Sequence, residues 1–286
     1  MAVAELSAAQ PAPEVRRRLG LVFWVAAGWI TVLLLAAACA ELLPLPDPID
    51  MDMLEARAPP TAEHWLGTDG LGRDVAARLL HGARVSLVVG LCAPLIGLVF
   101  GGAAGMLAGY FRGRLDTLVS GGVDVLLAFP PLVLALAVTA FLGQSVLHMT
   151  LILGFLGVPA FTRVARAATL GFSQREFVTA ARALGATHAR ILLRELLPNV
   201  MLPLVAFVLV GVAVTIVVES ALSFLGLGVP PPQPSWGSMI AEGRESLDGA
   251  AWLAFTPALV MFVTVLAFNL IGDTLRALTD PRRSAL

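Results

Sequence analysis

The sequence predicts an all-α membrane protein with about six transmembrane helices. Of its 286 residues, 58% are hydrophobic and only 14% are charged, a composition that is typical of membrane proteins and excludes an ordinary soluble domain. Apolar runs long enough to cross a bilayer recur along the chain, and they show almost none of the polar faces of soluble helices. We predict six such spans, at about 21–43, 83–109, 117–142, 148–167, 201–225 and 251–275.

The distribution of arginine predicts the orientation of these spans. All 19 basic residues are arginine, and the chain has no lysine. If the N-terminus is cytoplasmic, about 14 arginines fall on inner segments and about five on outer ones, in agreement with the positive-inside rule. Both termini are therefore predicted to be cytoplasmic, because an even number of spans returns the chain to its starting side.

The first predicted transmembrane helix covers residues 21–43 and follows a polar tail, residues 1–20. Its apolar stretch is longer than that of a signal peptide and five more spans follow, so we expect it to be retained. The next segment, 44–82, is predicted to be an outer loop rich in proline and acidic residues. A carboxylate-lined metal site in this loop is an alternative, but a solvated loop is the simpler interpretation.

The outer loop contains the segment Gly-Thr-Asp-Gly-Leu-Gly-Arg-Asp, which ends at Asp74. Thr68 or Asp69 could cap a helix here. Asp69 and Arg73, and likewise Asp74 and Arg78, have the i,i+4 spacing of helical ion pairs. Each such pair contributes only about 0.2–0.5 kcal/mol, so stability alone is a weak reason for this pattern.

Small residues follow a regular pattern in the second predicted span. They recur at every fourth position, at Gly97, Gly101, Gly105 and Gly109. Such a ridge lets another helix backbone approach closely. Packing within the same subunit is the favoured interpretation, and packing against a second membrane subunit is the alternative.

Two carboxylates lie inside predicted spans, Asp124 in the third and Glu219 in the fifth. An ionised carboxylate at the bilayer centre costs at least about 2.5 kcal/mol, so each is expected to face the bundle, a water-filled cavity or a partner. Both are candidates for lining a translocation path. A purely structural contact is equally favoured for Glu219 and is favoured for Asp124. Prolines in spans three to six predict kinked or broken helices, at Pro130, Pro131, Pro159, Pro203 and Pro257.

The segment between the fourth and fifth spans is predicted to form a helix–glycine–helix elbow on the cytoplasmic side. Ser173 and Glu176 have the spacing of a capping box that starts the first helix, and Gly185 ends it. Thr187 can cap a second helix that is expected to end before Pro198. The residues of the first helix that are predicted to share one face are Phe177, Ala180, Ala181 and Leu184.

The outer segment before the last span is rich in proline and contains Ser235 and Trp236. Ser235 is predicted to cap a short helix. Trp236 is predicted to lie at the membrane interface, because its ring is apolar while its indole N–H is polar.

The sequence contains no motif that would carry chemistry. Without lysine, a phosphate-binding Walker A loop is impossible, and no metal-binding or nucleophile motif is present. We therefore predict no catalytic residue, no metal and no cofactor on this chain. If the protein transports a solute uphill, the energy has to come from a partner or from an ion gradient.

Three segments resemble one family, the C-type membrane permease subunits of the dipeptide, oligopeptide and nickel ABC importers. The elbow resembles the EAA loop of importer permeases, with Thr179 in the place where that family usually has glutamate. The Gly-Thr-Asp-x-x-Gly-Arg-Asp signature is the second segment, and the stretch around Glu219 and Trp236 is the third. The resemblance covers roughly residues 64–283.

This resemblance implies the type I ABC importer permease fold, with five transmembrane helices in a core (83–278) that includes a coupling loop (168–200). It also implies a cytoplasmic C-terminal tail (279–286) and a place in the bacterial inner membrane. The expected partners are membrane lipid, a homologous B-type permease, a periplasmic substrate-binding protein and two cytoplasmic ATPases, which would hold ATP and magnesium. Nucleic acid is not an expected partner. Peptides are the first expected substrate, ahead of nickel and glutathione.

The resemblance also implies roles for individual residues. The predicted ATPase-coupling residues are Glu176, Ala180, Ala181, Gly185, Leu197 and Pro198. The candidates for a periplasmic gate or a binding-protein contact are Asp69, Arg73, Asp74 and Trp236. Two rival hypotheses remain at this point: an ion-coupled secondary transporter with Asp124 and Glu219 as relays, and an intramembrane enzyme or scaffold.

Overall fold

The computed structural model describes residues 19–279, and nearly all of them are helical. Most of the two predicted tails, 1–20 and 279–286, therefore lies outside the described residues. The helices, in chain order, are α1 (Leu21–Ala38), η1 (Ala40–Leu42), η2 (Met53–Glu55), α2 (Val75–Ile96), η3 (Gly97–Gly101), α3 (Gly102–Phe111), α4 (Gly113–Leu127), α5 (Pro131–Leu142), α6 (Val146–Phe172), α7 (Glu176–Ala183), α8 (His188–Arg190), η4 (Ile191–Leu196), α9 (Leu197–Phe224), α10 (Trp236–Arg244), α11 (Leu247–Ala250) and α12 (Trp252–Thr279).

Five continuous helical stretches are long and apolar enough to cross a membrane, and a sixth span results if a bent pair is counted as one. The bent pair joins α4 to α5 at an angle of 80°. The third predicted span is therefore broken at Pro130 and Pro131, as its prolines predict. The second span begins at Val75, ahead of the predicted 83–109. The five continuous stretches are Leu21–Ala38, Val75–Phe111, Val146–Phe172, His188–Phe224 and Trp252–Ala277.

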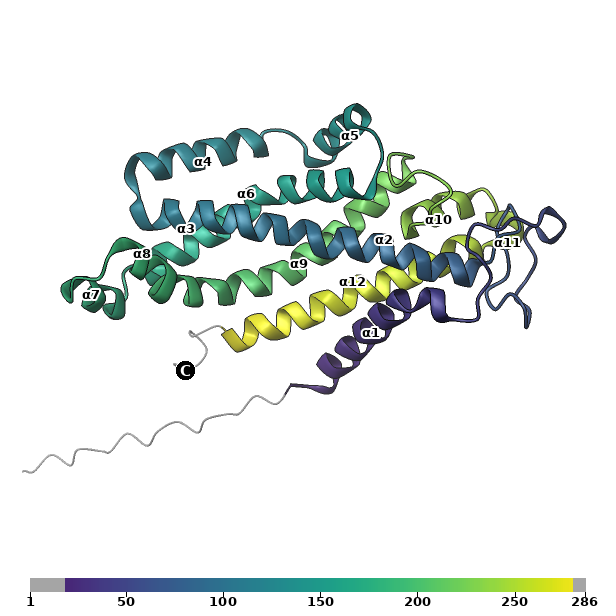
Figure 1. Cartoon of the computed structure of the whole chain (residues 1–286), viewed down its shortest axis with the longest axis horizontal. Coiled ribbons are helices and arrows are strands. Elements are labelled where there is room, and N and C mark those ends of the chain that lie inside the picture. Colours follow the sequence, from purple (N-terminus) through teal and green to yellow (C-terminus); the bar gives the residue numbers. More distant parts are fainter. Residues whose placement is uncertain (1–18, 280–286) are drawn as a thin grey trace, which may run out of the picture.

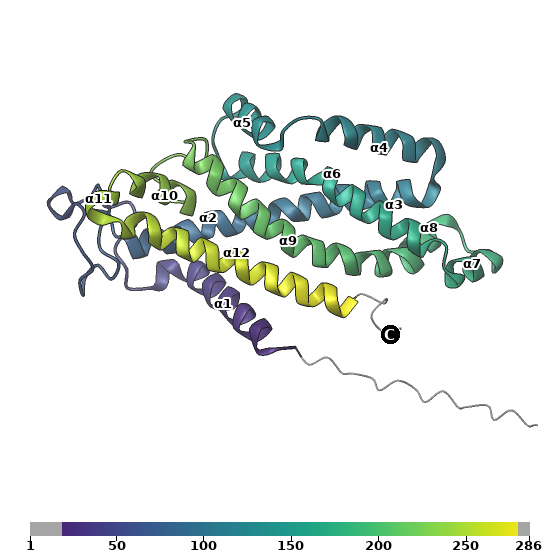
Figure 2. The same ribbon diagram turned by 180° about the vertical axis from the view of Figure 1, so that it is seen from behind.

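The long helices run side by side as an elongated bundle (Figure 1). Helices α2, α6 and α9 pack against one another in its middle, α12 packs on α9, and α1 lies against α12 and α2. Helix α4 covers α3 and α6 on one side (Figure 2). We call the end that carries α10, α11 and residues 44–74 the loop end. The opposite end, which carries α7 and α8, is the elbow end.

The glycine ridge packs inside the subunit. A Cβ atom built on Gly101 would lie 2.5 Å from the carbonyl oxygen of Val158, and one on Gly109 would lie 2.8 Å from that of Arg166. Both acceptors belong to α6, so the backbones of α3 and α6 approach as closely as glycine allows. Of the two interpretations of the ridge, the structure confirms packing within one chain.

The other prolines do not break their helices. Pro159, Pro203 and Pro257 lie inside α6, α9 and α12, which continue through them. The prediction of broken helices was therefore wrong at these three positions. Pro159 lies in the middle of α6, whereas Pro203 and Pro257 lie within the first two turns of α9 and α12, and packing along the bundle keeps the chain helical despite the missing N–H.

Candidate functional site

The elbow end contains the short helix–glycine–helix unit that the sequence predicts. Helix α7 ends at Ala183 and is closed by Gly185, whose φ of +79° is a left-handed conformation that glycine adopts without strain. The N–H of Gly185 donates to the Arg182 carbonyl and that of Ala186 donates to the Ala181 carbonyl, both at 3.0 Å. This pair of bonds is the Schellman arrangement that closes a helix. The Thr187 side chain then caps the next helix by accepting from the Arg190 N–H at 3.3 Å, as predicted.

Two details of the predicted elbow were wrong. Ser173 does not cap α7, because its hydroxyl closes the preceding helix by donating to the Leu170 carbonyl at 3.1 Å. Nor does the second helix end before Pro198. It continues through a π-helical segment, Ile191–Leu196, into α9, with Pro198 in the first turn of that helix, where a missing N–H is tolerated.

Helix α7 has one packed face and one free apolar face. Val178 is fully buried and Ala181 is half-buried, and both belong to the apolar cluster that includes the end of α3 and η4. Of the residues predicted to share one face of α7, Ala181 is the one that the cluster half-buries, whereas Phe177, Ala180 and Leu184 are exposed. Phe177 is 38% exposed and Leu184 is 89% exposed. These two apolar side chains are therefore open to contact from outside this chain.

The predicted coupling residues divide into two groups on this elbow. Glu176, Ala180, Gly185 and Pro198 are exposed and can meet another protein. Ala181 and Leu197 are half-buried in the apolar cluster that holds the elbow to the bundle. These two residues shape the elbow without being free to touch a partner.

Tyr110 anchors the elbow to the bundle, and the sequence analysis missed it. Its hydroxyl lies 2.8 Å from Nδ1 of His188, at the start of α8. The Arg182 guanidinium lies 5.5 Å from the centre of the Tyr110 ring, within the range of a cation–π contact. The end of the second span is thus tied to both short helices of the elbow. The available signal was that Tyr110 is the single tyrosine of the chain.

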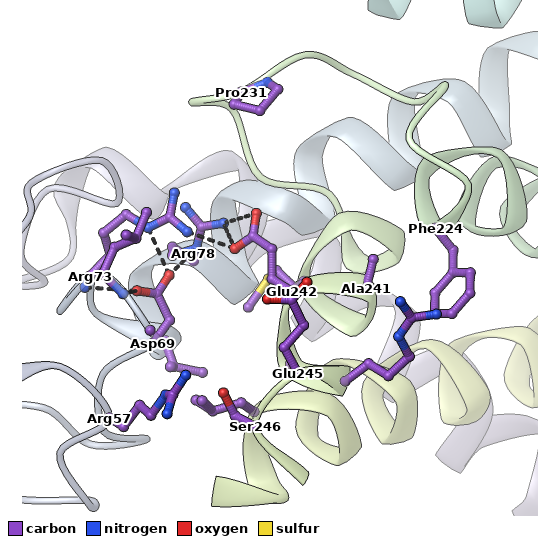
Figure 3. Close-up of a pocket in the computed structure, with 17 residues that line it drawn as sticks. Arg57, Asp69, Arg73, Arg78, Phe224, Pro231, Ala241, Glu242, Glu245 and Ser246 are labelled. Carbon is purple, nitrogen blue, oxygen red and sulfur yellow. Dashed lines mark hydrogen bonds and ion pairs between the residues drawn. The ribbon is translucent and has the colours of Figure 1, made fainter.

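At the loop end, four charged side chains form a network that is buried except at Glu242 (Figure 3). Asp69 contacts Arg73 at 2.7 Å, as predicted from their spacing, and also Arg78 at 3.2 Å. Glu242 of α10 contacts the same two arginines, at 2.6 Å and 2.9 Å respectively. The network therefore joins the 44–74 segment, α2 and α10, which lie far apart in the sequence.

Asp74 does not pair with Arg78, so this prediction was wrong. Its Oδ1 accepts from the Ala77 N–H at 2.7 Å, which makes Asp74 the N-cap of α2 in place of the predicted Thr68 or Asp69. Its Oδ2 lies 2.8 Å from Nδ1 of His64. The physical reason is that both Asp74 oxygens are already engaged, by the Ala77 N–H and by His64, while Arg78 pairs with Asp69 and Glu242.

Trp236 is fully buried, so its predicted place at the membrane interface was wrong. Its indole N–H donates to the Leu79 carbonyl at 3.2 Å, and the ring lies in the main apolar cluster. Ser235 does cap α10, through a reciprocal capping box with Ser238. In this conformation the Trp236 side chain cannot touch another protein, although α10 remains a candidate gate element.

Three of the predicted gate residues are nearly buried. Asp69, Arg73 and Asp74 are each less than a tenth exposed. Their side chains hold the loop end together, so a direct contact with a binding protein would require this network to open. Glu242 is the exception, because its side chain is 41% exposed.

His64 bridges two carboxylates in the outer loop. Its second ring nitrogen, Nε2, lies 2.9 Å from Glu55. The hydrogen bond to Asp74 raises the pKa of His64 above its usual value of 6.5, and the nearby charges of Asp74 and Glu55 act in the same direction. Burial opposes this shift. The protonated ring is therefore favoured in the folded loop.

We expect His64→Gln to remove a pH-dependent part of the stability. Because the folded-state pKa is raised, the bridge contributes its full stabilisation below pH 6.5 and loses it as the pH rises through the raised pKa. The thermal unfolding midpoints of both proteins should be measured from about pH 5 to about pH 9. The wild-type advantage should be largest at the acidic end and should shrink as the pH rises. A constant difference across this range would contradict the assignment.

The two intramembrane carboxylates have different environments. Glu219 is fully buried and its oxygens accept from three serine hydroxyls, those of Ser86 at 3.0 Å, Ser223 at 2.7 Å and Ser220 at 3.3 Å. Asp124 is exposed on α4, where its carboxylate contacts Arg163 of α6 at 2.8 Å. Both carboxylates therefore make a structural contact, which the sequence analysis kept as an alternative to a place on the translocation path. Only Asp124 is exposed on the surface of this chain.

Comparison with known proteins agrees with this geometry. The family of binding-protein-dependent transport system inner membrane components matches residues 101–285. The glutathione transport system permease protein GsiD of Pectobacterium atrosepticum is 40% identical over 260 residues, which cover 90% of this chain and 86% of that protein. The dipeptide transport system permease protein DppC of Alkalihalophilus pseudofirmus is 38% identical over 253 residues, covering 88% and 83%.

A solved structure shows the same fold. A chain of the inward-facing MetNI methionine ABC transporter superposes with a TM-score of 0.60 at 20% identity, covering 71% of this chain and 96% of that one. The relatives are permease proteins, and the helices described above are those of a multi-pass membrane protein. This chain therefore belongs to the family of binding-protein-dependent transport system inner membrane components, as a permease subunit of an ABC importer.

Proposed function

We propose that this chain forms, with a homologous B-type permease, the path by which an ATP-driven importer takes up di- or oligopeptides. The observation that carries the proposal is the elbow: an exposed apolar strip on α7, closed by a left-handed glycine and tied to the second span through Tyr110. Such an element can transmit movement from a soluble protein to the bundle. The relatives named for glutathione and dipeptide transport support the substrate class.

Two cytoplasmic ATPases would supply the energy. One of them would dock on Phe177, Ala180 and Leu184 of α7, with Gly185 and Pro198 at the edge of the contact. ATP and magnesium would bind to those partners, and the chain itself would act as a transport subunit without catalysis. Closure of the ATPases would move the elbows of the two permeases together and open the path on the other side of the membrane.

The elbow end would lie in the cytoplasm, together with both termini. The positive-inside rule supports this orientation, because about 14 arginines fall on the predicted inner segments against about five on the outer ones. The loop end would then face the periplasm of a bacterial inner membrane, where a loaded binding protein delivers the substrate. The network of Asp69, Arg73 and Glu242 would act there as part of a gate.

The path itself would run along the exposed face of α4, against the partner permease. Asp124 is the candidate on that face, whereas Glu219 would act from inside the bundle by positioning α10 and α2 through Ser86. An ion-coupled secondary transporter is the rival mechanism, with these two carboxylates as relays. Co-purification of an ATPase with the permease would decide against that rival.

Uptake of labelled dipeptide, glutathione and nickel tests the substrate, in cells that lack the gene and in complemented cells. We expect deletion to abolish dipeptide uptake that depends on ATP, and complementation to restore it. Loss of glutathione uptake alone would favour the alternative substrate that the first relative suggests. Loss of nickel uptake alone would overturn the peptide proposal while keeping the importer class.

A further inference from the structure

Helix α4, on which the translocation path is proposed, has no direct chain connection to the elbow. The elbow follows α6 and leads into α9, whereas α4 follows α3 and leads into α5 (Figure 1). In the described chain, Val123 is the one buried residue of α4. Apolar packing therefore attaches α4 only weakly to the rest of this chain, and polar contacts have to make it follow a movement of the elbow.

An ion pair with two parallel hydrogen bonds holds α4 to α6. Nη2 of Arg166 donates to Oδ2 of Asp116 at 2.7 Å, and Nε of Arg166 donates to Oδ1. The Asp116 side chain is only 19% exposed and that of Arg166 is 36% exposed. The Ser120 hydroxyl donates to the same carboxylate at 3.3 Å. Because a guanidinium and a carboxylate that share two bonds fix each other's orientation, this pair determines how α4 lies on α6.

A second ion pair joins the same two helices more loosely. Nη2 of Arg163 lies 2.8 Å from Oδ1 of Asp124, and both side chains are more than half exposed. Exposed pairs of this kind contribute little, because solvent competes for both groups. The pair of Asp116 and Arg166 is therefore the stronger connection between α4 and α6.

Arg166 also lies where the backbones of α3 and α6 meet. A Cβ atom built on Gly109 would lie 2.8 Å from the Arg166 carbonyl oxygen, and one on Gly105 would lie 2.9 Å from the Arg166 nitrogen. Helices that approach this closely transmit a displacement, because packed interiors are nearly incompressible. The backbone of Arg166 thus contacts α3, while its side chain holds α4.

The end of α3 contacts the elbow on two sides. Tyr110 directly follows Gly109, and its hydroxyl lies 2.8 Å from Nδ1 of His188 in α8. Nη2 of Arg112 donates to the Ser173 hydroxyl at 3.3 Å, at the turn that precedes α7. A displacement of the elbow therefore acts directly on the end of α3.

We propose that three successive contacts carry movement of the elbow to α4: His188 with Tyr110, Gly109 with Arg166, and Arg166 with Asp116. When an ATPase displaces the elbow, Tyr110 moves the end of α3. Helices α3 and α6 then move as one unit, and the ion pair makes α4 follow. Contiguous packing and ion pairs of this kind can couple distant sites. This inference rests on the function proposed above and adds to it the connection between the docking surface and the path.

The first test compares dipeptide uptake with ATP hydrolysis in proteoliposomes that contain the assembled importer. Asp116→Asn and Tyr110→Phe each remove one contact and keep the shape of the side chain. Each should lower the uptake per ATP hydrolysed at least about fivefold, the lower end of typical coupling between sites. Exchange of the two charges, Asp116→Arg with Arg166→Asp, should restore most of the wild-type ratio. Arg114→Gln removes an exposed charge from the same helix and is the matched control, which should keep the wild-type ratio.

Two results of this test would overturn the inference. The first is an unchanged ratio in both Asp116→Asn and Tyr110→Phe. The second is a parallel fall of uptake and hydrolysis, because contacts that only stabilise the fold change the amount of working importer and leave the ratio unchanged.

Double electron–electron resonance tests the connection without any transport, on the assembled importer in nanodiscs. Spin labels are attached at two exposed positions, Ala183→Cys in α7 and Gly121→Cys in α4, after Cys39 and Cys92 have been replaced by alanine. We expect one narrow distance that is the same with and without ATP, and a clearly wider distribution in Asp116→Asn. A wild-type distance that changed with ATP would show that the elbow and α4 move separately, and would overturn the inference.

The two measurements separate a failure of this inference from a failure of the proposed function. If the wild-type importer hydrolysed ATP and took up no dipeptide, the proposed substrate would be refuted, and the distance measurement alone would decide the connection. If dipeptide uptake were normal and the distance from the elbow to α4 changed with ATP, the connection would be refuted and the import function would stand.

Discussion

Gly105→Leu should strongly destabilise the bundle and lower its yield from membranes. A Cβ atom at this position would lie 2.8 Å from the Cβ of Ala165 and 2.9 Å from the backbone nitrogen of Arg166. Backbone atoms of α6 cannot move aside without displacing the whole helix, so larger side chains would separate α3 from α6. Overpacking of this kind typically costs about 1–3 kcal/mol, and occasionally more. This is a large part of the roughly 5–15 kcal/mol that stabilises an average domain.

The thermal unfolding midpoint of the detergent-solubilised chain measures this effect, together with its yield from membranes. Gly121→Leu is the matched control, because a Cβ atom at Gly121 of α4 meets nothing within 4 Å in this chain. We expect the control to keep the wild-type midpoint and yield. If both variants unfolded at the same temperature, the close packing of α3 on α6 would not be a main source of stability.

The glycine ridge shows how far the sequence could predict the fold. Its four-residue spacing places all four glycines on one helix face, which predicts a close helix contact. The spacing contains no information about the helix on the other side. Only the three-dimensional arrangement identifies α6, and with it the choice between packing within one chain and packing between two.

The loop end was less predictable, because its contacts are long-range. Glu242 lies 164 residues from Arg78, and no local pattern connects them. The i,i+4 rule paired Asp74 with Arg78, but it presupposes a helix, whereas Asp74 is the residue at which the helix begins. The sequence analysis predicted that Trp236 lies at the membrane interface, because its ring is apolar, its indole N–H is polar and it precedes a span. The folding of α10 back onto α2 and α9 buries it instead.

The observed environment of Asp124 differs from the predicted membrane interior for a related reason. The residue lies in a long apolar run, which predicts the interior of a membrane span. The run is broken after Leu127, and Val123 is the one fully buried residue of α4. Asp124 therefore reaches the surface and finds Arg163, a partner that the sequence did not indicate.

Gly185→Arg is expected to leave the bundle folded and to abolish uptake. A Cβ atom at Gly185 meets nothing within 4 Å, so an arginine side chain has room and the core is not disturbed. The φ of +79° makes any L-residue other than asparagine or aspartate unfavourable there, at a cost of about 1–2 kcal/mol. That cost acts on the last turn of α7, beside the exposed Leu184, so the elbow would distort while the helices of the bundle stay in place.

Two further variants separate the contribution of backbone strain from that of the bulky charge. Gly185→Asn keeps a residue that tolerates the left-handed conformation and should retain most of the uptake. Gly185→Ala introduces the strain without the charge and should give an intermediate rate. For Gly185→Arg we expect less than about a tenth of the wild-type rate, a change that corresponds to about 1.4 kcal/mol in coupling or docking.

The measurement is dipeptide uptake into proteoliposomes that contain the assembled importer, with ATP hydrolysis recorded in parallel. A docking role predicts that hydrolysis no longer supports uptake in Gly185→Arg, while the amount of the chain in the membrane stays normal. If the variant were absent from the membrane, Gly185 would have a structural role and the elbow would be part of the folding core. If uptake were normal at a normal membrane level, the exposed face of α7 would not be the docking surface, because a charged side chain of this size beside Leu184 could not be accommodated in an apolar contact.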